Sequence, residues 1–260
     1  MYPYPIIGNI SLYEIFFTVG LIVALVIFRL LCDVKKMHAK ATNFYIICAV
    51  VSIAAGYGGA ILFQAVYNAV ESGKFVINNE TGMTFLGGLI SGAAVFLLLH
   101  ATVARKLFSG DERKKNFSAI LMIAPCCICA AHGFGRIGCL MAGCCYGKSV
   151  TSAIGVLAQA PGKHLPVQLF EAVFLFALSA ILIALLIKGY KLGFPVYLMA
   201  YGVFRFIIEY FRADYRGNLI PGLSPSQALS LLMVVFGALW IIYLRYKKIP
   251  FRESSDKGDW

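Results

Sequence analysis

Four polar side chains recur at helical spacing inside an otherwise apolar stretch of this sequence. Tyr201, Arg205, Glu209 and Arg212 are separated by four, four and three residues, which places them on one face of a helix. A guanidinium group suits bidentate contact with phosphate, so one interpretation is a site for a phosphorylated head group. The other interpretation is an internal ion pair between Arg205 and Glu209 that joins this helix to its neighbours.

A second arginine, Arg136, lies in a glycine-rich segment over residues 131–147. Its five glycines disfavour a plain helix, and glycine lets the backbone approach a ligand closely and offer its N–H groups to anions. Close packing between helices is the alternative role for these glycines. His132 lies four residues before Arg136, so a helix would place both side chains on one side.

Six of the eight cysteines fall within one short part of the chain, namely Cys126, Cys127, Cys129, Cys139, Cys144 and Cys145. Their spacing lacks the paired C-x₂-C arrangement of zinc sites, so the sequence predicts no metal ligands. The first three lie in an apolar stretch, where cysteine behaves as a small hydrophobic residue. Cys144 and Cys145 follow Arg136, whose positive charge favours a reactive thiolate, so a nucleophilic or redox role is possible for them. A disulfide with Cys139 and plain packing are the alternatives.

The chain as a whole has the composition of a membrane protein. Of its 260 residues 60% are hydrophobic and only 13% are charged, against about 25% charged in soluble domains, and the mean hydropathy is +0.80. A spanning helix needs about 20 apolar residues. We therefore expect an all-α integral membrane protein, one polytopic domain over residues 1–260 with about seven spans. The apolar stretches are 12–31, 44–67, 83–104, 117–141, 167–187, 193–211 and 226–244.

The basic residues predict how the chain is oriented in the membrane. Most of the 23 Lys and Arg residues lie in the first, third and fifth loops and in the C-terminal tail, which includes Lys257. Cytoplasmic loops collect Lys and Arg, so we expect the N-terminus outside the cell and the C-terminus in the cytoplasm. This bias also accounts for most of the net charge of +11, so no nucleic-acid partner is expected. The first apolar stretch is long and lacks a basic segment before it and a small-residue cleavage site, so no cleavable signal peptide is expected.

Arg136 and Arg205 fall well inside apolar stretches, whereas Arg29, near the end of the first stretch, is counted with the first loop. An arginine at the bilayer centre costs about 2.5–3.5 kcal/mol on insertion scales, and such residues usually face a cavity or a site. Both arginines are therefore candidate site residues.

Six segments in order resemble the prolipoprotein diacylglyceryl transferase family. They are residues 10–17 with Tyr13, 85–92 with Gly87 and Gly88, 135–147, 165–171 with Gln168 and Glu171, 201–212 and 223–230. Within the second segment, Gly88 and Gly92 also predict a close helix-packing face.

The resemblance implies transfer of diacylglyceryl from phosphatidylglycerol to the lipobox cysteine of a preprolipoprotein, with glycerol 1-phosphate leaving, in a bacterial plasma (inner) membrane. Arg136 and Arg205 would handle the phosphate, supported by Tyr201 and Glu209, and no cofactor is expected. Further positions are expected to contact the substrate, namely Tyr13, Gly87, Gly88, Gly138, Cys139, Gly143, Gln168, Glu171, Glu209 and Arg212.

This sequence departs from the family motifs at several polar positions. The family's His before Gly-Gly is Leu86, its Asn after Gly-Arg-x-Gly is Cys139, its later Asn is Ala142, and its Glu is Cys144. The hypothesis here is that His132 replaces the lost base, with a helix-end histidine of structural role as the alternative. A second hypothesis gives Cys144 or Cys145 a part in transfer or in redox gating.

Three other functions fit the same residues. The protein could use the same lipid donor with an acceptor other than a lipoprotein. The replaced motif residues, Leu86, Cys139, Ala142 and Cys144, would fit a different acceptor. A lipid-binding scaffold could keep the phosphate site without chemistry. A membrane thiol oxidoreductase could use Cys144 and Cys145, although the sequence shows no quinone or flavin motif.

Overall fold

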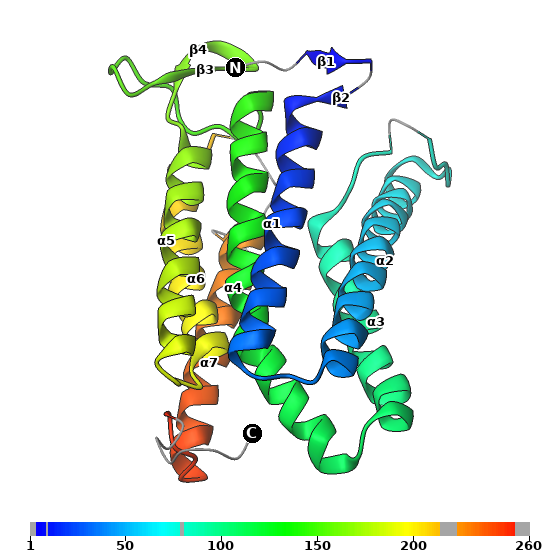
Figure 1. The fold of residues 1–260 in the computed structure, drawn as a ribbon. Helices are drawn as coiled ribbons and strands as arrows, with labels where there is room; N and C mark the ends of the chain where they lie inside the picture. Colours follow the sequence, from blue (N-terminus) through cyan, green and yellow to red (C-terminus); the bar gives the residue numbers. More distant parts are fainter. Residues whose placement is uncertain (1–3, 9, 79–80, 214–222, 253–260) are drawn as a thin grey trace. The chain divides into compact units, whose positions relative to one another are not determined.

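The computed structural model describes residues 4–8, 10–78, 81–213 and 223–252, so Lys257 of the predicted basic tail lies outside the described residues. Within this part the chain forms seven α-helices and two short β-hairpins (Figure 1). The helices are α1 Leu12–Val34, α2 Ala39–Ser72, α3 Phe85–Leu107, α4 Gly110–Ala142, α5 Val167–Ile187, α6 Gly193–Glu209 and α7 Pro225–Tyr246. The strands are β1 Pro5–Ile7, β2 Ile10–Ser11, β3 Val156–Ala158 and β4 Ala160–His164.

The prediction of an all-α membrane protein is confirmed. Six of the described helices, all except α6, are long and apolar enough to cross a membrane. The remaining helix, α6, has 17 residues and carries Arg205 and Glu209. The helices α2 and α4 have 34 and 33 residues, because polar segments at their ends continue the helical backbone beyond the apolar stretch. Neither hairpin was predicted, since each is too short to give a periodic pattern.

The glycine-rich segment is more regular than its sequence predicts. The expectation of an irregular backbone from residue 131 onward is wrong, because α4 continues through Gly133, Gly135 and Gly138 to Ala142. Neighbouring atoms leave no room for a larger residue at two of these glycines. A Cβ atom on Gly133 would lie 2.7 Å from the Phe176 ring, and one on Gly138 would lie 3.2 Å from the Tyr13 carbonyl oxygen. Close packing, the alternative role, therefore accounts for these two positions.

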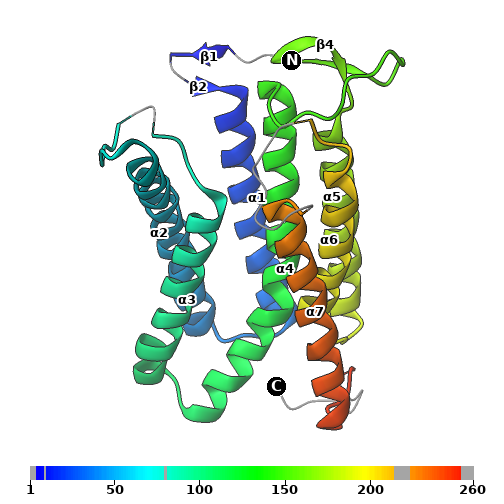
Figure 2. The same ribbon diagram turned by 180° about the vertical axis from the view of Figure 1, so that it is seen from behind.

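The contacts divide the chain into two compact units, Met1–Lys35 with Ala119–Trp260, and Lys36–Ser118. In the second unit α2 and α3 lie side by side (Figure 2). A Cβ atom on Gly88 would lie 3.2 Å from the Gly56 carbonyl oxygen, and one on Gly92 would lie 3.0 Å from that of Ser52. The predicted packing role of Gly88 and Gly92 is confirmed, while a single domain over residues 1–260 stays a prediction.

The first unit holds both embedded arginines. Its helices α6 and α7 approach each other closely at Gly202. A Cβ atom on this glycine would lie only 2.9 Å from the Ser230 carbonyl oxygen of α7. On α5 and α6, the Phe174 and Phe204 rings stack with centroids 4.0 Å apart. Helix α7 begins with a capping box, in which the Ser224 hydroxyl accepts from the Gln227 backbone N–H and the Gln227 side chain accepts from the Ser224 N–H.

Hydrogen bonds join the loops at each end of the first unit. The loop after α5 pairs with the segment after α7, where the Lys191 N–H donates to the Phe251 carbonyl at 2.8 Å and Arg252 Nε donates to the Lys188 carbonyl at 3.1 Å. The loop after α4 pairs with the end of α6, where the Lys148 N–H donates to the Phe211 carbonyl at 2.8 Å. Two segments predicted to be cytoplasmic, the loop after α5 and the segment after α7, thus lie at the same end of this unit.

Candidate active site

A buried carboxylate organises the first of two polar clusters inside the helices. Glu171 on α5 is fully buried, and its Oε2 lies 2.9 Å from Arg136 Nε on α4. Its Oε1 accepts a hydrogen bond of 2.8 Å from the Tyr201 hydroxyl on α6. His132 Nε2 lies 3.8 Å from the same oxygen. Three helices thus meet through one carboxylate.

The helical spacing on α4 explains why this cluster forms. His132 and Arg136 are one turn apart, so their side chains lie on the same side of α4 and both reach Glu171. The ring of His132 also packs edge-on against Tyr201, with centroids 5.4 Å apart. The sequence predicted the shared side of His132 and Arg136. It could not show that Glu171 is the common partner, because that residue is distant in sequence.

The second cluster surrounds Arg205 on α6. Arg205 Nη2 lies 2.8 Å from Glu209 Oε2 and donates a hydrogen bond of 3.1 Å to the Ser226 hydroxyl on α7. The Ser224 hydroxyl donates to Glu209 Oε1 at 2.9 Å, and Arg212 Nε lies 3.9 Å from Glu209 Oε2. The ion pair predicted between Arg205 and Glu209 is therefore present.

One amino group of the Arg205 guanidinium has no hydrogen-bond partner among the described residues. This group, Nη1, is buried. A buried donor without a partner costs free energy unless a ligand or water satisfies it. Nη1 can therefore donate a hydrogen bond to an anionic oxygen atom of a ligand.

The predicted stripe does not lie on α6 as a whole, because the helix ends at Glu209 and Arg212 follows it, and its four residues divide between the two clusters. Tyr201 joins the Glu171 cluster, whereas Arg205, Glu209 and Arg212 form the other. Tyr201 thus contacts the carboxylate that pairs with Arg136, and its supporting role towards the two arginines stays a prediction. Ser224 and Ser226 were not predicted as site residues, although their segment was among those that resemble the family.

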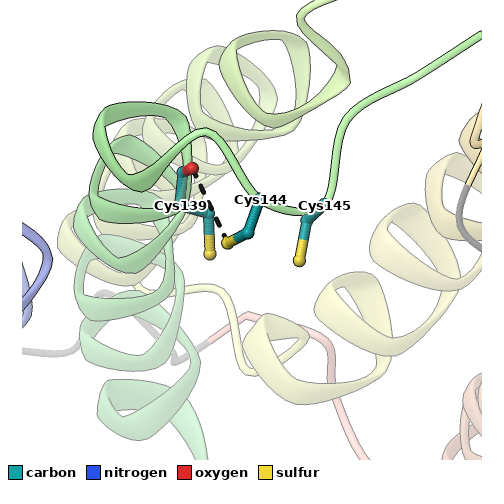
Figure 3. Close-up of side chains that lie close together, drawn as sticks. All are labelled: Cys139, Cys144 and Cys145. Carbon is teal, nitrogen blue, oxygen red and sulfur yellow. Dashed lines mark hydrogen bonds between the residues drawn. The ribbon is translucent and has the colours of Figure 1, made fainter. Parts of the chain in front are cut away.

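The three cysteines that follow Arg136 come together at the end of α4 (Figure 3). The Sγ atoms of Cys139, Cys144 and Cys145 all lie within 4.8 Å of one another. None of the eight cysteines, all within the described residues, forms a disulfide, so the disulfide considered for Cys139 is absent. Hydrogen bonding with Cys139 raises the pKa of the Cys144 thiol, while hydrogen bonds from Cys139 and Cys144, with the nearby Arg212 guanidinium, hold the pKa of Cys145 below its usual range.

Gln168 and Gly143 shape the turn that carries these cysteines. Gln168 Nε2 donates a hydrogen bond of 2.5 Å to the Cys144 carbonyl, and its Oε1 is buried without a partner among the described residues. Gly143 adopts a φ of 73°, a left-handed conformation that ends α4 and that glycine tolerates best. Their predicted contacts with a substrate stay predictions.

The remaining predicted contact residues lie on helices. Tyr13 on α1 packs beside Gly138 of α4 in the first unit. Gly87 and Gly88 belong to α3 in the second unit, where a Cβ atom on Gly87 would collide with the Phe63 side chain of α2. Substrate contact by these residues also stays a prediction.

Comparisons with known proteins show the family to which this chain belongs. A family model described as prolipoprotein diacylglyceryl transferase matches residues 5–243. Two relatives are a phosphatidylglycerol–prolipoprotein diacylglyceryl transferase from Clostridium tetani, 34% identical over 77% of this chain and 80% of its own, and transferase 2 from Clostridium perfringens, 32% identical over 77% of each chain. A transferase of the same name from Wolbachia pipientis is 30% identical over 96% of each chain. The expected kinship is confirmed: this chain is a multi-pass membrane protein that belongs to the prolipoprotein diacylglyceryl transferase family.

Proposed function

We propose that this protein transfers diacylglyceryl from phosphatidylglycerol to an acceptor thiol, the lipobox cysteine of a preprolipoprotein. Arg205 is the observation that carries this proposal. It is an arginine buried inside the helices, fixed on one edge by Glu209 and Ser226, with Nη1 left without a partner among the described residues. The names of the relatives supply the donor and the acceptor.

The chemistry requires charge stabilisation and removal of a proton. The acceptor thiol gives its proton to a base, and the thiolate attacks the glyceryl carbon that bears the phosphate. A carbon–sulfur bond forms, the carbon–oxygen bond breaks, and glycerol phosphate leaves with the electron pair. Guanidinium groups at Arg136 and Arg205 would hold the phosphate and stabilise the charge that develops on the departing oxygen.

His132 is the base in this proposal. Its ring contacts Tyr201 and lies near the Glu171 carboxylate, and about a quarter of its side chain is exposed, so an acceptor proton can reach it. Glu171 would orient the imidazole and stabilise the imidazolium that forms, the task a carboxylate performs beside a catalytic histidine. Glu171 is therefore a positioning residue for both His132 and Arg136.

Replacement of His132 by alanine is expected to lower the rate of transfer by about 10²- to 10⁴-fold, the usual contribution of a positioned base. Binding of phosphatidylglycerol should change little, because both arginines remain. The measurement is release of labelled glycerol phosphate by the purified protein, with and without added imidazole, which should restore part of the rate. His38→Ala, at an exposed helix cap, is the control. Unchanged turnover in the His132 variant would remove the histidine from the mechanism.

Incubation of the purified protein with labelled phosphatidylglycerol and a lipobox peptide tests the proposed function directly. We expect a diacylglyceryl thioether on the peptide cysteine and one glycerol phosphate released per peptide modified. Release of glycerol phosphate without peptide modification would point to another acceptor. The departures from the family motifs at Leu86, Cys139 and Cys144 would be consistent with that result. No turnover would favour a lipid-binding scaffold.

We also propose that the N-terminus lies outside the cell and the C-terminus in the cytoplasm. The shared end of the loop after α5 and the segment after α7 supports it, since both carry basic residues. A cysteine introduced at Lys163 on β4 should then react with a membrane-impermeant maleimide in intact cells. A cysteine introduced at Lys247, which is exposed after α7, should react after the cells are opened. The reverse pattern would overturn this orientation.

A further inference from the structure

Three thiols at the end of α4 take no part in the proposed transfer. Cys139 lies in the last turn of α4, and Cys144 and Cys145 follow in the turn after it, as Figure 3 shows. Their Sγ atoms lie within 4.8 Å of one another, and all three side chains are partly buried. Such convergence of three sulfur atoms needs an explanation beyond packing, because packing does not require the same atom type to meet three times.

The backbone holds this convergence in place. The Cys144 N–H donates to the Cys139 carbonyl at 3.2 Å, which folds the turn back over the helix end. Cys145 has a φ of 60°, a left-handed conformation that few residues other than glycine adopt, and it keeps the third sulfur in the cluster. A cysteine in this conformation is strained, whereas glycine or asparagine would adopt it at a lower cost in free energy.

Hydrogen bonds from other elements fix the same turn from outside. Gln168 on α5 donates to the Cys144 carbonyl, and the Gln159 N–H donates to the Gly143 carbonyl at 3.0 Å. Gln159 Nε2 also donates to the Ala142 carbonyl at 2.8 Å. The three sulfur atoms are therefore positioned before any ligand arrives, as a metal site requires.

The number and type of donor atoms select the ion. Thiolates are soft ligands that favour Cu(I) and zinc. Structural zinc sites are almost always four-coordinate, and within the described residues this cluster gathers three cysteines with no fourth Cys, His, Asp or Glu. Metal–sulfur bonds of about 2.3 Å place three sulfur atoms of a trigonal plane about 4 Å apart. Small side-chain rotations would close the present cluster to that spacing.

We propose that Cys139, Cys144 and Cys145 form a trigonal thiolate site for a soft monovalent metal ion, and that this ion is Cu(I). Binding releases the three thiol protons to solvent and involves no change of oxidation state. Three thiolates and one Cu(I) carry a net charge of −2. Arg212 beside Cys145 offsets part of this charge, and Arg136, which pairs with Glu171, lies one helical turn before Cys139.

The test uses the full-length, reduced protein in detergent under anaerobic conditions, titrated with Cu(I) in competition with a chromogenic Cu(I) chelator. We expect one tightly held Cu(I) per chain, with X-ray absorption reporting three sulfur neighbours at about 2.3 Å. Replacing Cys139, Cys144 and Cys145 together by alanine should weaken binding at least about 100-fold. The triple alanine variant at Cys126, Cys127 and Cys129 keeps the site and is the matched control, since these buried thiols lie on the same helix.

Several results would overturn the site. They are less than one Cu(I) bound per chain, equal binding by the two triple variants, or an absorption spectrum without three sulfur neighbours. A disulfide that joins Cys139 to Cys144 or Cys145 in protein isolated without oxidant would also contradict it, as would tighter binding of Zn(II) than of Cu(I). The stoichiometry and the spectrum of the unmodified protein decide the matter even where a variant does not fold. All these readouts are independent of transferase activity.

Discussion

Arg205→Lys is expected to lower the rate of phosphatidylglycerol turnover by about 10²- to 10³-fold, the loss typical of removing one donor to a developing negative charge. Lysine keeps the positive charge, but it lacks the planar fork that can bind Glu209 and Ser226 on one edge and a phosphate on the other. The measurement is kcat/KM for release of labelled glycerol phosphate by purified protein.

The control for this prediction is Arg29→Lys. Arg29 on α1 is half exposed and lies 3.3 Å from Asp33, so the exchange alters a surface ion pair of little energetic weight. The control should retain turnover within about twofold. If Arg205→Lys also retains turnover while its lipid is bound normally, Arg205 does not stabilise the leaving group and its ion pair with Glu209 is structural.

Replacement of Glu171 by alanine is expected to give the largest loss of stability. The carboxylate is fully buried, pairs with Arg136 and accepts a hydrogen bond from Tyr201. Removing one partner of a buried ion pair costs about 3–5 kcal/mol, because the remaining charge stays desolvated and unpaired. The melting temperature of the detergent-solubilised protein should fall by about 10 °C.

Two further variants sharpen this prediction. Glu171→Gln keeps an acceptor for the Tyr201 hydroxyl and loses the charge, so its melting temperature should lie between those of the parent protein and Glu171→Ala. Glu112→Ala removes an exposed carboxylate in the first turn of α4 and should melt like the parent. A Glu171→Ala protein that melts within about 2 °C of the parent would show that the cluster is not a stabilising centre.

The spans and the embedded charges could be predicted from the sequence because both depend on local patterns. Helical periodicity placed Tyr201, Arg205 and Glu209 on one face, and the spacing between His132 and Arg136 placed these two on one side of α4. The structure bears out both placements. Family motifs, read in order along the chain, gave the kinship that the comparisons establish.

Partners from distant segments could not be predicted. Glu171 is 35 residues from Arg136 and 30 from Tyr201, and no local pattern states that α4, α5 and α6 meet there. Ser226 was missed for the same reason, since its contact with Arg205 depends on the close approach of α6 and α7 at Gly202. Such contacts depend on how side chains pack between helices, which is a property of the folded chain.

By itself, the sequence determined that this chain is a helical membrane protein with two arginines where lipid should exclude them. Apolar length and charge suffice for that, because the bilayer imposes the same solvation cost on every spanning segment. Only the tertiary structure decided how these arginines are compensated, that the glycine-rich segment stays helical, and that Cys139, Cys144 and Cys145 converge. These outcomes depend on contacts between helices and loops that are distant in sequence. The absence of a Cβ atom at Gly202 lets two helices approach, and the left-handed φ of Cys145 keeps its sulfur atom in the cluster.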